Sequence, residues 1–159
     1  MIKIIYVLTI VFFSVNMQLY SLDVPLNLII KDISYGDDDS LKATGSKLLS
    51  VNYTGWLFNP KADTKDYCKA KGEIFDSNTL DKFNHKVPFQ FVLGSGLVIK
   101  GWEMGLQNMK INDVRCLVIP PKLAYGNRKM GNILEANSTL IFEIQLLDII
   151  NLDTEEKEQ

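Results

Sequence analysis

The sequence has few residues of the kinds that carry covalent or metal chemistry. Its 159 residues include one histidine, His85, and two cysteines, Cys68 and Cys116. Metal sites and activated nucleophiles are built from clustered residues of these types, and no such cluster is present. The motifs G-x-G-x-x-G, G-K-[ST], H-E-x-x-H and G-x-S-x-G are also missing. We therefore expect no metal site and no cofactor, and the common hydrolase and nucleotide-dependent classes are excluded.

The chain also lacks an excess of positive charge. Lys and Arg number 17 against 19 Asp and Glu, which gives a formal net charge of -2. Proteins that bind nucleic acid attract the phosphate backbone with a basic surface. No nucleic-acid partner is therefore expected.

The sequence has no run of apolar residues long enough to span a membrane, although its N-terminus is apolar. Lys3 is followed by uncharged and mainly apolar residues over positions 4–15. A spanning helix needs ~20 such residues, whereas a secretory signal needs an apolar core of ~7–15. We predict a signal peptide over residues 1–21 and an exported protein with no membrane span after cleavage. The alternative is an uncleaved anchor, because the uncharged stretch extends to Leu22.

Residues 22–150 show no repeat and no further change of composition, which indicates one folded domain followed by a polar tail, 151–159. The alternating or apolar pattern of β-strands occurs in five segments, 26–34, 47–57, 87–93, 113–119 and 139–150. Helical spacing occurs once, at Ile99, Trp102, Leu106 and Met109. One helix cannot provide the crossovers of a parallel sheet. The predicted class is α+β, with an antiparallel sheet of five strands and one short helix on its face.

Two interpretations of the cysteines stay open. In an oxidising compartment Cys68 and Cys116 would form a disulfide, and closing so long a loop stabilises a fold by on the order of 4 kcal/mol in the chain-entropy model. Alternatively they are unrelated thiols. Cys68 lies in a Lys-rich, loop-like stretch and Cys116 in a predicted strand, so nothing local brings them together.

Aromatic residues supply the remaining signal. Taken singly each is most simply a core residue, but their neighbours form six blocks in a fixed order. These are V-N-Y-T-G-W-L (51–57), F-D-S (75–77), P-F-Q-F-V-L-G (88–94), V-I-K-G-W (98–102), I-P-P-K-L-A-Y-G (119–126) and S-T-L-I-F-E (138–143). Together they closely resemble the FKBP family of peptidyl-prolyl cis-trans isomerases, the macrolide-binding immunophilins. The resemblance covers residues 46–150, and 26–45 fit the first strand of that family more loosely.

The resemblance implies a half-barrel sheet wrapped around the helix, and a pocket for proline. It assigns substrate binding to Tyr53, Phe75, Phe89, Val98, Trp102, Ile133 and Phe142, with Trp102 as the floor. It assigns the catalytic contacts to Asp76, the Tyr125 hydroxyl and the backbone N–H of Ile99. The implied partners are proline-containing polypeptides, with macrolides as inhibitors, and we expect a monomer.

The resemblance leaves open the cellular location and one alternative function. We expect an isomerase that assists the folding of exported proteins in a bacterial periplasm, with the endoplasmic reticulum lumen as the alternative location. The alternative function is a noncatalytic peptide-binding or chaperone module on the same fold.

The chain departs from the family pattern at several loops. Residues 59–71 are a polar insertion that we expect to emerge beside the pocket. A smaller expansion between Ser77 and Pro88 contains His85, and Arg128 is expected near the rim. These differences affect substrate preference and macrolide affinity more than the fold.

Overall fold

The structure is a computed structural model that describes residues 21–36 and 39–152. The predicted signal peptide over 1–21 lies outside the described residues except for its last position, as does the predicted tail from residue 153 onward. Within the described part, no helix has the length and apolar character needed to cross a membrane.

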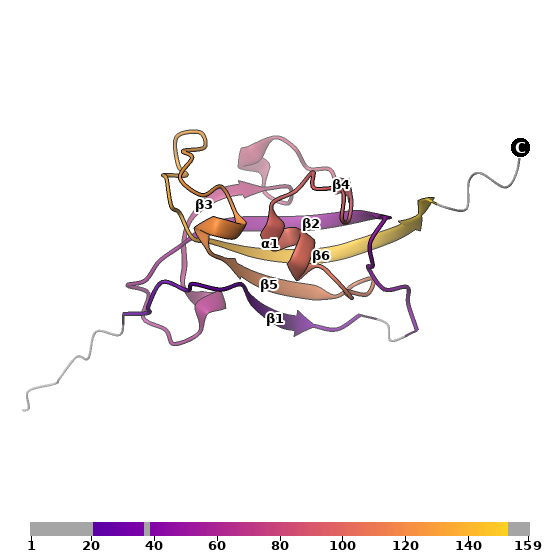
Figure 1. Cartoon of the computed structure of the whole chain (residues 1–159), viewed down its shortest axis with the longest axis horizontal. Helices are drawn as coiled ribbons and strands as arrows, with labels where there is room; N and C mark the ends of the chain where they lie inside the picture. The colour runs from indigo at the N-terminus through magenta and orange to yellow at the C-terminus, as the bar shows by residue number, and fades with distance from the viewer. Residues whose placement is uncertain (1–20, 37–38, 153–159) are drawn as a thin grey trace, which may run out of the picture.

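Six strands form one antiparallel sheet (Figure 1). They are β1 (Ile29–Ser34), β2 (Lys47–Phe58), β3 (Lys71–Ser77), β4 (Phe89–Val92), β5 (Val114–Ile119) and β6 (Leu140–Asn151). The strand order is β1-β5-β6-β2-β3, and β4 pairs with the first part of β2. The long central pair, β2 and β6, therefore carries the rest of the sheet.

The α+β class and the antiparallel sheet are confirmed, but the predicted number of five strands is wrong. The missed strand is β3, in which Ile74 and Phe75 are adjacent apolar residues among Lys, Gly, Glu, Asp and Ser. It therefore has no alternating pattern, and its pairing with β2 contains two register shifts. β1 also begins at Ile29 rather than at Leu26.

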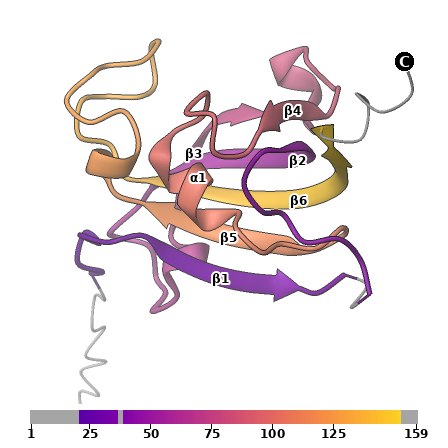
Figure 2. The same ribbon diagram turned by 45° about the vertical axis from the view of Figure 1, so that its right-hand side comes forward.

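The helix α1 (Lys100–Gly105) lies on one face of the sheet (Figure 2). Alternate residues of β6 bury their side chains on that face, and they are Leu140, Phe142, Ile144 and Leu146. Trp102 and Leu106 join the same core cluster from the helix side. The apolar residues that alternate along β6 and those at helical spacing thus pack into one core, as the sequence pattern predicts.

The helix is shorter than the spacing of its apolar residues suggests. Asn108 has a positive φ of 61°, which a helix cannot continue through. Arg115, on the neighbouring strand β5, donates from Nη1 to the carbonyl oxygens of Gly105 and Gln107 at 2.8 and 2.9 Å. Its Nε bonds to Asp32 at 2.6 Å. The buried guanidinium therefore satisfies carbonyls at the helix end and ties β1 to it.

Two glycines allow the helix to lie directly on β5. A Cβ atom at Gly101 would overlap the Ile119 side chain, and one at Gly105 would approach Leu117 Cδ1 to 2.6 Å. The spacing of four residues between these glycines in the sequence already indicates this close approach.

Replacing Gly105 with alanine is expected to lower the free energy of unfolding by about 1–3 kcal/mol, because overpacking against Leu117 outweighs the better helix propensity of alanine. Gly45→Ala is the matched control, since a Cβ there meets nothing within 4 Å. Urea unfolding of both variants checks this. Equal stabilities of the two variants would contradict the close approach.

The opposite face of the sheet carries a second, smaller apolar cluster. Cys68 lies in a single-turn 3-10 helix, Tyr67–Lys69, and is bonded to Cys116 of β5 with a Cα–Cα distance of 6.1 Å. Around the bond lie Ala70, Val118 and Ile141, all buried. Cys116 and Val118 alternate along β5 with residues that face α1. The disulfide interpretation is the one that the structure supports.

The disulfide also fixes the position of the polar insertion relative to the sheet. Residues 59–71 do not line the pocket described below; they pack across the other face of the sheet, and Lys31 of β1 forms an ion pair with Asp66. The expectation that the insertion emerges beside the pocket is therefore wrong. Its polar sequence conceals the few apolar side chains, such as Tyr67 and Ala62, that hold it to the sheet.

Candidate functional site

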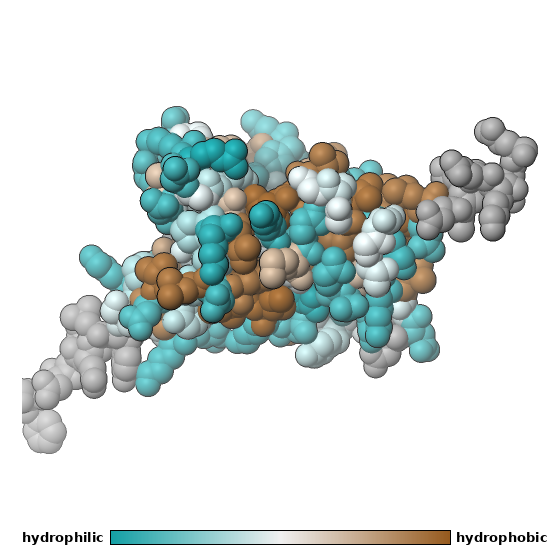
Figure 3. All heavy atoms as spheres, in the orientation of Figure 1, coloured by the Kyte–Doolittle hydropathy of each residue, from teal (hydrophilic) through white to brown (hydrophobic). Residues whose placement is uncertain are grey.

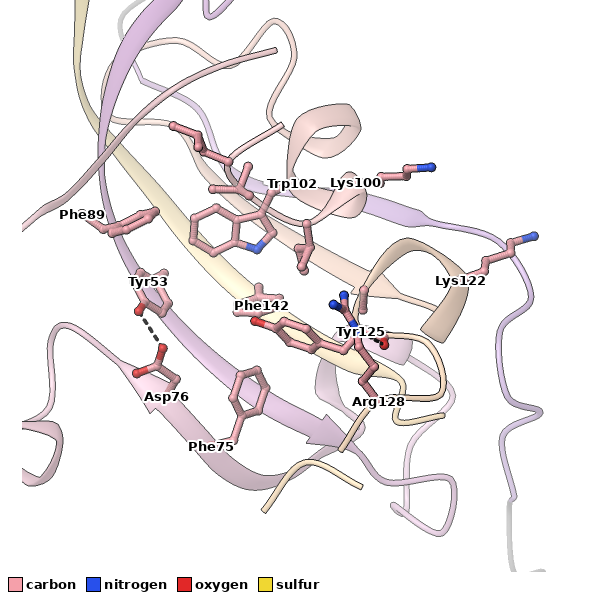
Figure 4. A pocket seen from close by; sticks show the side chains of 14 residues that line it. Tyr53, Phe75, Asp76, Phe89, Lys100, Trp102, Lys122, Tyr125, Arg128 and Phe142 are labelled. Atoms are coloured by element: carbon pink, nitrogen blue, oxygen red, sulfur yellow. Dashed lines mark hydrogen bonds between the residues drawn. The ribbon is translucent and has the colours of Figure 1, made fainter. Parts of the chain in front are cut away.

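A cavity of about 560 Å³ opens between α1, β2, β3 and the loop that follows β5 (Figure 4). Its lining comprises Tyr53, Phe75, Asp76, Phe89, Leu97, Val98, Ile99, Lys100, Trp102, Lys122, Ala124, Tyr125, Arg128 and Phe142. Apolar surface fills the middle of this face and hydrophilic side chains border it (Figure 3). Pockets of this size and character take small ligands or short peptide segments.

The structure brings together all the predicted site residues except one. Ile133 is half-buried in the 127–137 loop and is not among the lining residues. Next to it, Leu134 turns into the core instead. The lining residues Leu97, Lys100, Lys122 and Ala124 were not predicted, although each lies within or beside one of the sequence blocks.

Aromatic rings form the floor and walls of the cavity. Trp102 is 4% exposed, and the rings of Tyr53 and Phe142 meet it edge-on with centroids 5.2 Å away. Phe89 approaches it at 6.1 Å and Phe75 packs against Phe142. Edge-to-face packing holds each ring in place, so the floor is rigid and shaped before any ligand binds.

One wall of the cavity carries a carboxylate held by two side chains. The Tyr53 hydroxyl donates to Asp76 Oδ2 at 2.7 Å, and His85 Nε2 lies 3.1 Å from Asp76 Oδ1. The backbone N–H of Ser77 donates to the same Oδ1 at 2.9 Å. The expansion that contains His85 therefore reaches the site, and its histidine touches the predicted catalytic carboxyl group.

A buried asparagine that the sequence did not reveal fixes this wall. Asn78 is 3% exposed and accepts a hydrogen bond from the Tyr53 N–H at 2.8 Å. Its own amide group donates to the carbonyl oxygens of Val51 and Val87 at 3.0 and 2.9 Å. Asn78 thus joins β2, the end of β3 and the loop before β4. Asn78 directly follows the F-D-S block, and this adjacency is the feature of the sequence that could have pointed to it.

Tyr125 stands on the other side of the cavity. It follows a 3-10 turn, Pro121–Leu123, and the Gly126 N–H donates back to the Pro121 carbonyl at 2.9 Å. Burial raises the pKa of the Tyr125 hydroxyl, the charge of Asp76 raises it further, and that of Arg128 lowers it. The hydroxyl is therefore a neutral donor at neutral pH, between an anion and a cation.

Ile99 contributes a backbone donor at the start of α1. It is the N-cap residue, with extended backbone angles, and its carbonyl accepts from the N–H of Trp102. Its own N–H has no acceptor in the described part of the chain. The loop before it is held by the Glu103 carboxylate, which accepts from the N–H groups of Gly94 and Gly96 at 2.5 and 2.8 Å. The donor is thus presented on a fixed loop.

The environment of Tyr53 predicts a change in stability at alkaline pH. Burial, then the hydrogen bond to Asp76, raises the pKa of Tyr53 above its ordinary value. In the unfolded chain this phenol loses its proton near pH 10, but the folded protein retains it, so the free energy of unfolding falls as the pH rises above about 10. Urea unfolding of the parent and of Tyr53→Phe between pH 8 and 10.5 should show a weaker alkaline loss in the variant. Identical pH profiles would refute this.

The fold and the site together define a ligand-binding protein of the α+β class. The cavity combines an aromatic lining with hydroxyl and N–H donors at its rim, which is the composition of a site for a small, mainly apolar ligand with a few polar groups. In the described residues no group of His, Cys, Asp and Glu is placed to hold a metal ion.

Comparison with known proteins identifies the family. A sequence profile described as FKBP-type peptidyl-prolyl cis-trans isomerase matches residues 40–147. The chain is 39% identical over 109 residues to FK506-binding protein 2 of Candida glabrata, covering 69% of each chain. It is 37% identical over 125 residues to peptidyl-prolyl cis-trans isomerase FKBP53 of Arabidopsis thaliana, covering 79% of this chain and 23% of that protein. It is 46% identical over 101 residues to FK506-binding protein 2B of Rhizopus delemar, covering 64% of this chain and 41% of that one.

The chain therefore belongs to the FKBP-type peptidyl-prolyl cis-trans isomerase family, as the sequence blocks indicated. It spans less than half the length of the Arabidopsis and Rhizopus relatives that it matches.

Proposed function

We propose that this protein catalyses the cis–trans isomerisation of X–Pro peptide bonds in polypeptides. The observation that carries the proposal is one cavity that joins the aromatic floor at Trp102 to two donors, the Tyr125 hydroxyl and the Ile99 N–H. Family membership supports the same activity.

The reaction needs no nucleophile, which fits the residues present. An X–Pro bond isomerises by rotation about the C–N bond, and its resonance gives a barrier of ~18–20 kcal/mol and uncatalysed times of tens to hundreds of seconds. The planar amide separates charge more than the twisted amide does. A cavity of low polarity therefore destabilises the planar form relative to the twisted one.

The rim donors complete the mechanism. The proline ring lies on Trp102, and the Ile99 N–H and the Tyr125 hydroxyl hold carbonyl oxygens of the chain in the twisted geometry. Asp76 fixes the Tyr53 side chain beside them through the 2.7 Å hydrogen bond. Interactions that are stronger in the twisted state than in the planar state lower the barrier.

The test is the cis-to-trans rate of an X–Pro test peptide with the protein added. We expect the protein to accelerate the isomerisation and FK506 to abolish this acceleration. The relatives carry the name FK506-binding protein, and such a macrolide would occupy the same cavity. A folded protein that gives no acceleration would overturn the proposal and favour a noncatalytic peptide-binding module.

We further propose that the protein acts outside the cytoplasm, in a bacterial periplasm, and assists the folding of exported proteins. The apolar run over residues 4–15 and the Cys68–Cys116 bond support this, because disulfides persist in oxidising compartments. The endoplasmic reticulum lumen is the alternative, and the fungal relatives favour it. N-terminal sequencing of the mature protein from fractionated cells tests export: a chain starting near residue 22 is expected, and an intact cytoplasmic chain would contradict it.

A further inference from the structure

The rim of the cavity carries an uneven distribution of charge. Lys100, Lys122 and Arg128 line it, against a single carboxylate, Asp76. The three cations come from different segments, the start of α1, the 3-10 turn after β5, and the loop that follows Tyr125. In Figure 4 they lie on the Tyr125 side of the cavity, and Asp76 lies across from them. We call these three residues the cationic rim.

The cationic rim is not neutralised by the protein. In the described residues none of its members forms an ion pair: Lys122 Nζ lies 3.3 Å from the Asn27 side-chain oxygen, and Arg128 Nε lies 3.4 Å from the Tyr125 carbonyl oxygen. Elsewhere on the surface, Lys31, Lys71, Lys86 and Lys129 each pair with a carboxylate. The rim thus keeps its positive charge although the whole chain has a net charge of -2.

Asp76 offsets the cationic rim only in part, because one carboxylate faces three cations across the cavity. Its two carboxylate oxygens are held by the Tyr53 hydroxyl and by His85, on the far wall. A ligand that crosses the cavity therefore meets positive charge at one end, neutral aromatic rings in the middle and the Asp76 carboxylate at the other end. Charges at the mouth of an apolar cavity attract an oppositely charged ligand more strongly than the same charges on an open surface.

We propose that the cationic rim selects polypeptide segments with an Asp or Glu residue next to the proline. The proposal rests on the isomerase function proposed above and names the substrate class of that site. The acidic side chain lies over Lys122 and Arg128 while the proline occupies the aromatic floor. The aromatic floor carries no charge, so the rim is expected to set the order among acidic, amide and basic residues at that position.

The experiment compares peptides that differ in one side chain. Peptides with Glu, Gln or Lys placed immediately before or immediately after the proline are assayed for kcat/KM at low and high salt. The parent is expected to prefer Glu to Gln at one of the two positions by about threefold to tenfold, with the preference shrinking at high salt. Lys is expected to be the poorest of the three at that position.

The double variant Lys122→Gln, Arg128→Gln should bring the Glu-to-Gln ratio close to one. Lys69→Gln, in the 3-10 turn on the opposite face of the sheet, is the control and should keep the parental ratio. A parental ratio of one at both positions, or a preference that survives in the double variant, overturns the proposal. If no peptide is isomerised, the proposed function fails, and the ratio of binding affinities for the Glu and Gln peptides decides the role of the rim separately.

Discussion

Replacing Asp76 with alanine is expected to lower kcat/KM for X–Pro isomerisation by about tenfold or more. The Tyr53 hydroxyl loses its acceptor at 2.7 Å, and His85 loses the carboxylate that it faces at 3.1 Å. Hydrogen bonds to a charged group are worth about 1.5–3 kcal/mol, which corresponds to about 10–100-fold in rate when the interaction acts in the transition state. The ring of Tyr53 would then no longer be fixed against Trp102.

The matched control is Asp81→Ala. Asp81 lies in the neighbouring 3-10 turn, Asp81–Phe83, where it is exposed and pairs with Lys86. It is expected to retain parental activity. Tyr53→Phe removes the hydrogen bond to Asp76 but keeps the Asp76 charge, so it separates the contributions of the two. Parental activity in a folded Asp76→Ala protein would show that the carboxylate has no part in the site.

Removing the disulfide is expected to have the largest effect on stability. The double variant Cys68→Ala, Cys116→Ala opens a loop with a sequence separation of 48 residues. The chain-entropy model assigns about 4 kcal/mol to closing a loop of this length, and Tm should fall by on the order of 10 °C. Isomerase activity below the new Tm should be retained, because the bond lies across the sheet from the cavity.

Reduction of the parent provides the control for this prediction. A thiol reductant should lower the Tm of the parent toward that of the double variant and leave the double variant unchanged. If reduction leaves the parental Tm as it was, the bond contributes nothing to stability. If the double variant loses activity while folded, the two faces of the sheet are coupled.

The parts of the fold that follow a local period were predictable from the sequence. Along β6 the alternation of Leu140, Phe142 and Ile144 fixes which side chains face the helix, because consecutive residues of a strand point to opposite faces. The pocket residues were predictable for a different reason. They lie in short blocks whose order along the chain is specific, and all but Ile133 reach the cavity.

The features that the sequence did not predict depend on long-range contacts. β3 has adjacent apolar residues and a pairing broken by register shifts, so it has no period to detect. The insertion over 59–71 is polar, and the contacts that hold it across the sheet, above all the bond from Cys68 to Cys116, join segments that are distant in sequence. The residues next to Asn78 do not indicate that its side chain is buried, because its three partners lie in two other segments, β2 and the loop before β4.

We propose that the cavity catalyses rotation about X–Pro bonds and does more than bind proline-containing segments. Two-dimensional exchange NMR on an X–Pro peptide with substoichiometric protein tests it most directly, because the cis and trans populations and both exchange rates are measured in one sample. If the cavity is a catalyst, both rates rise together while the cis:trans ratio of the peptide stays unchanged. A peptide that binds the folded protein without any increase in its exchange rates would show that the cavity is a binding site only.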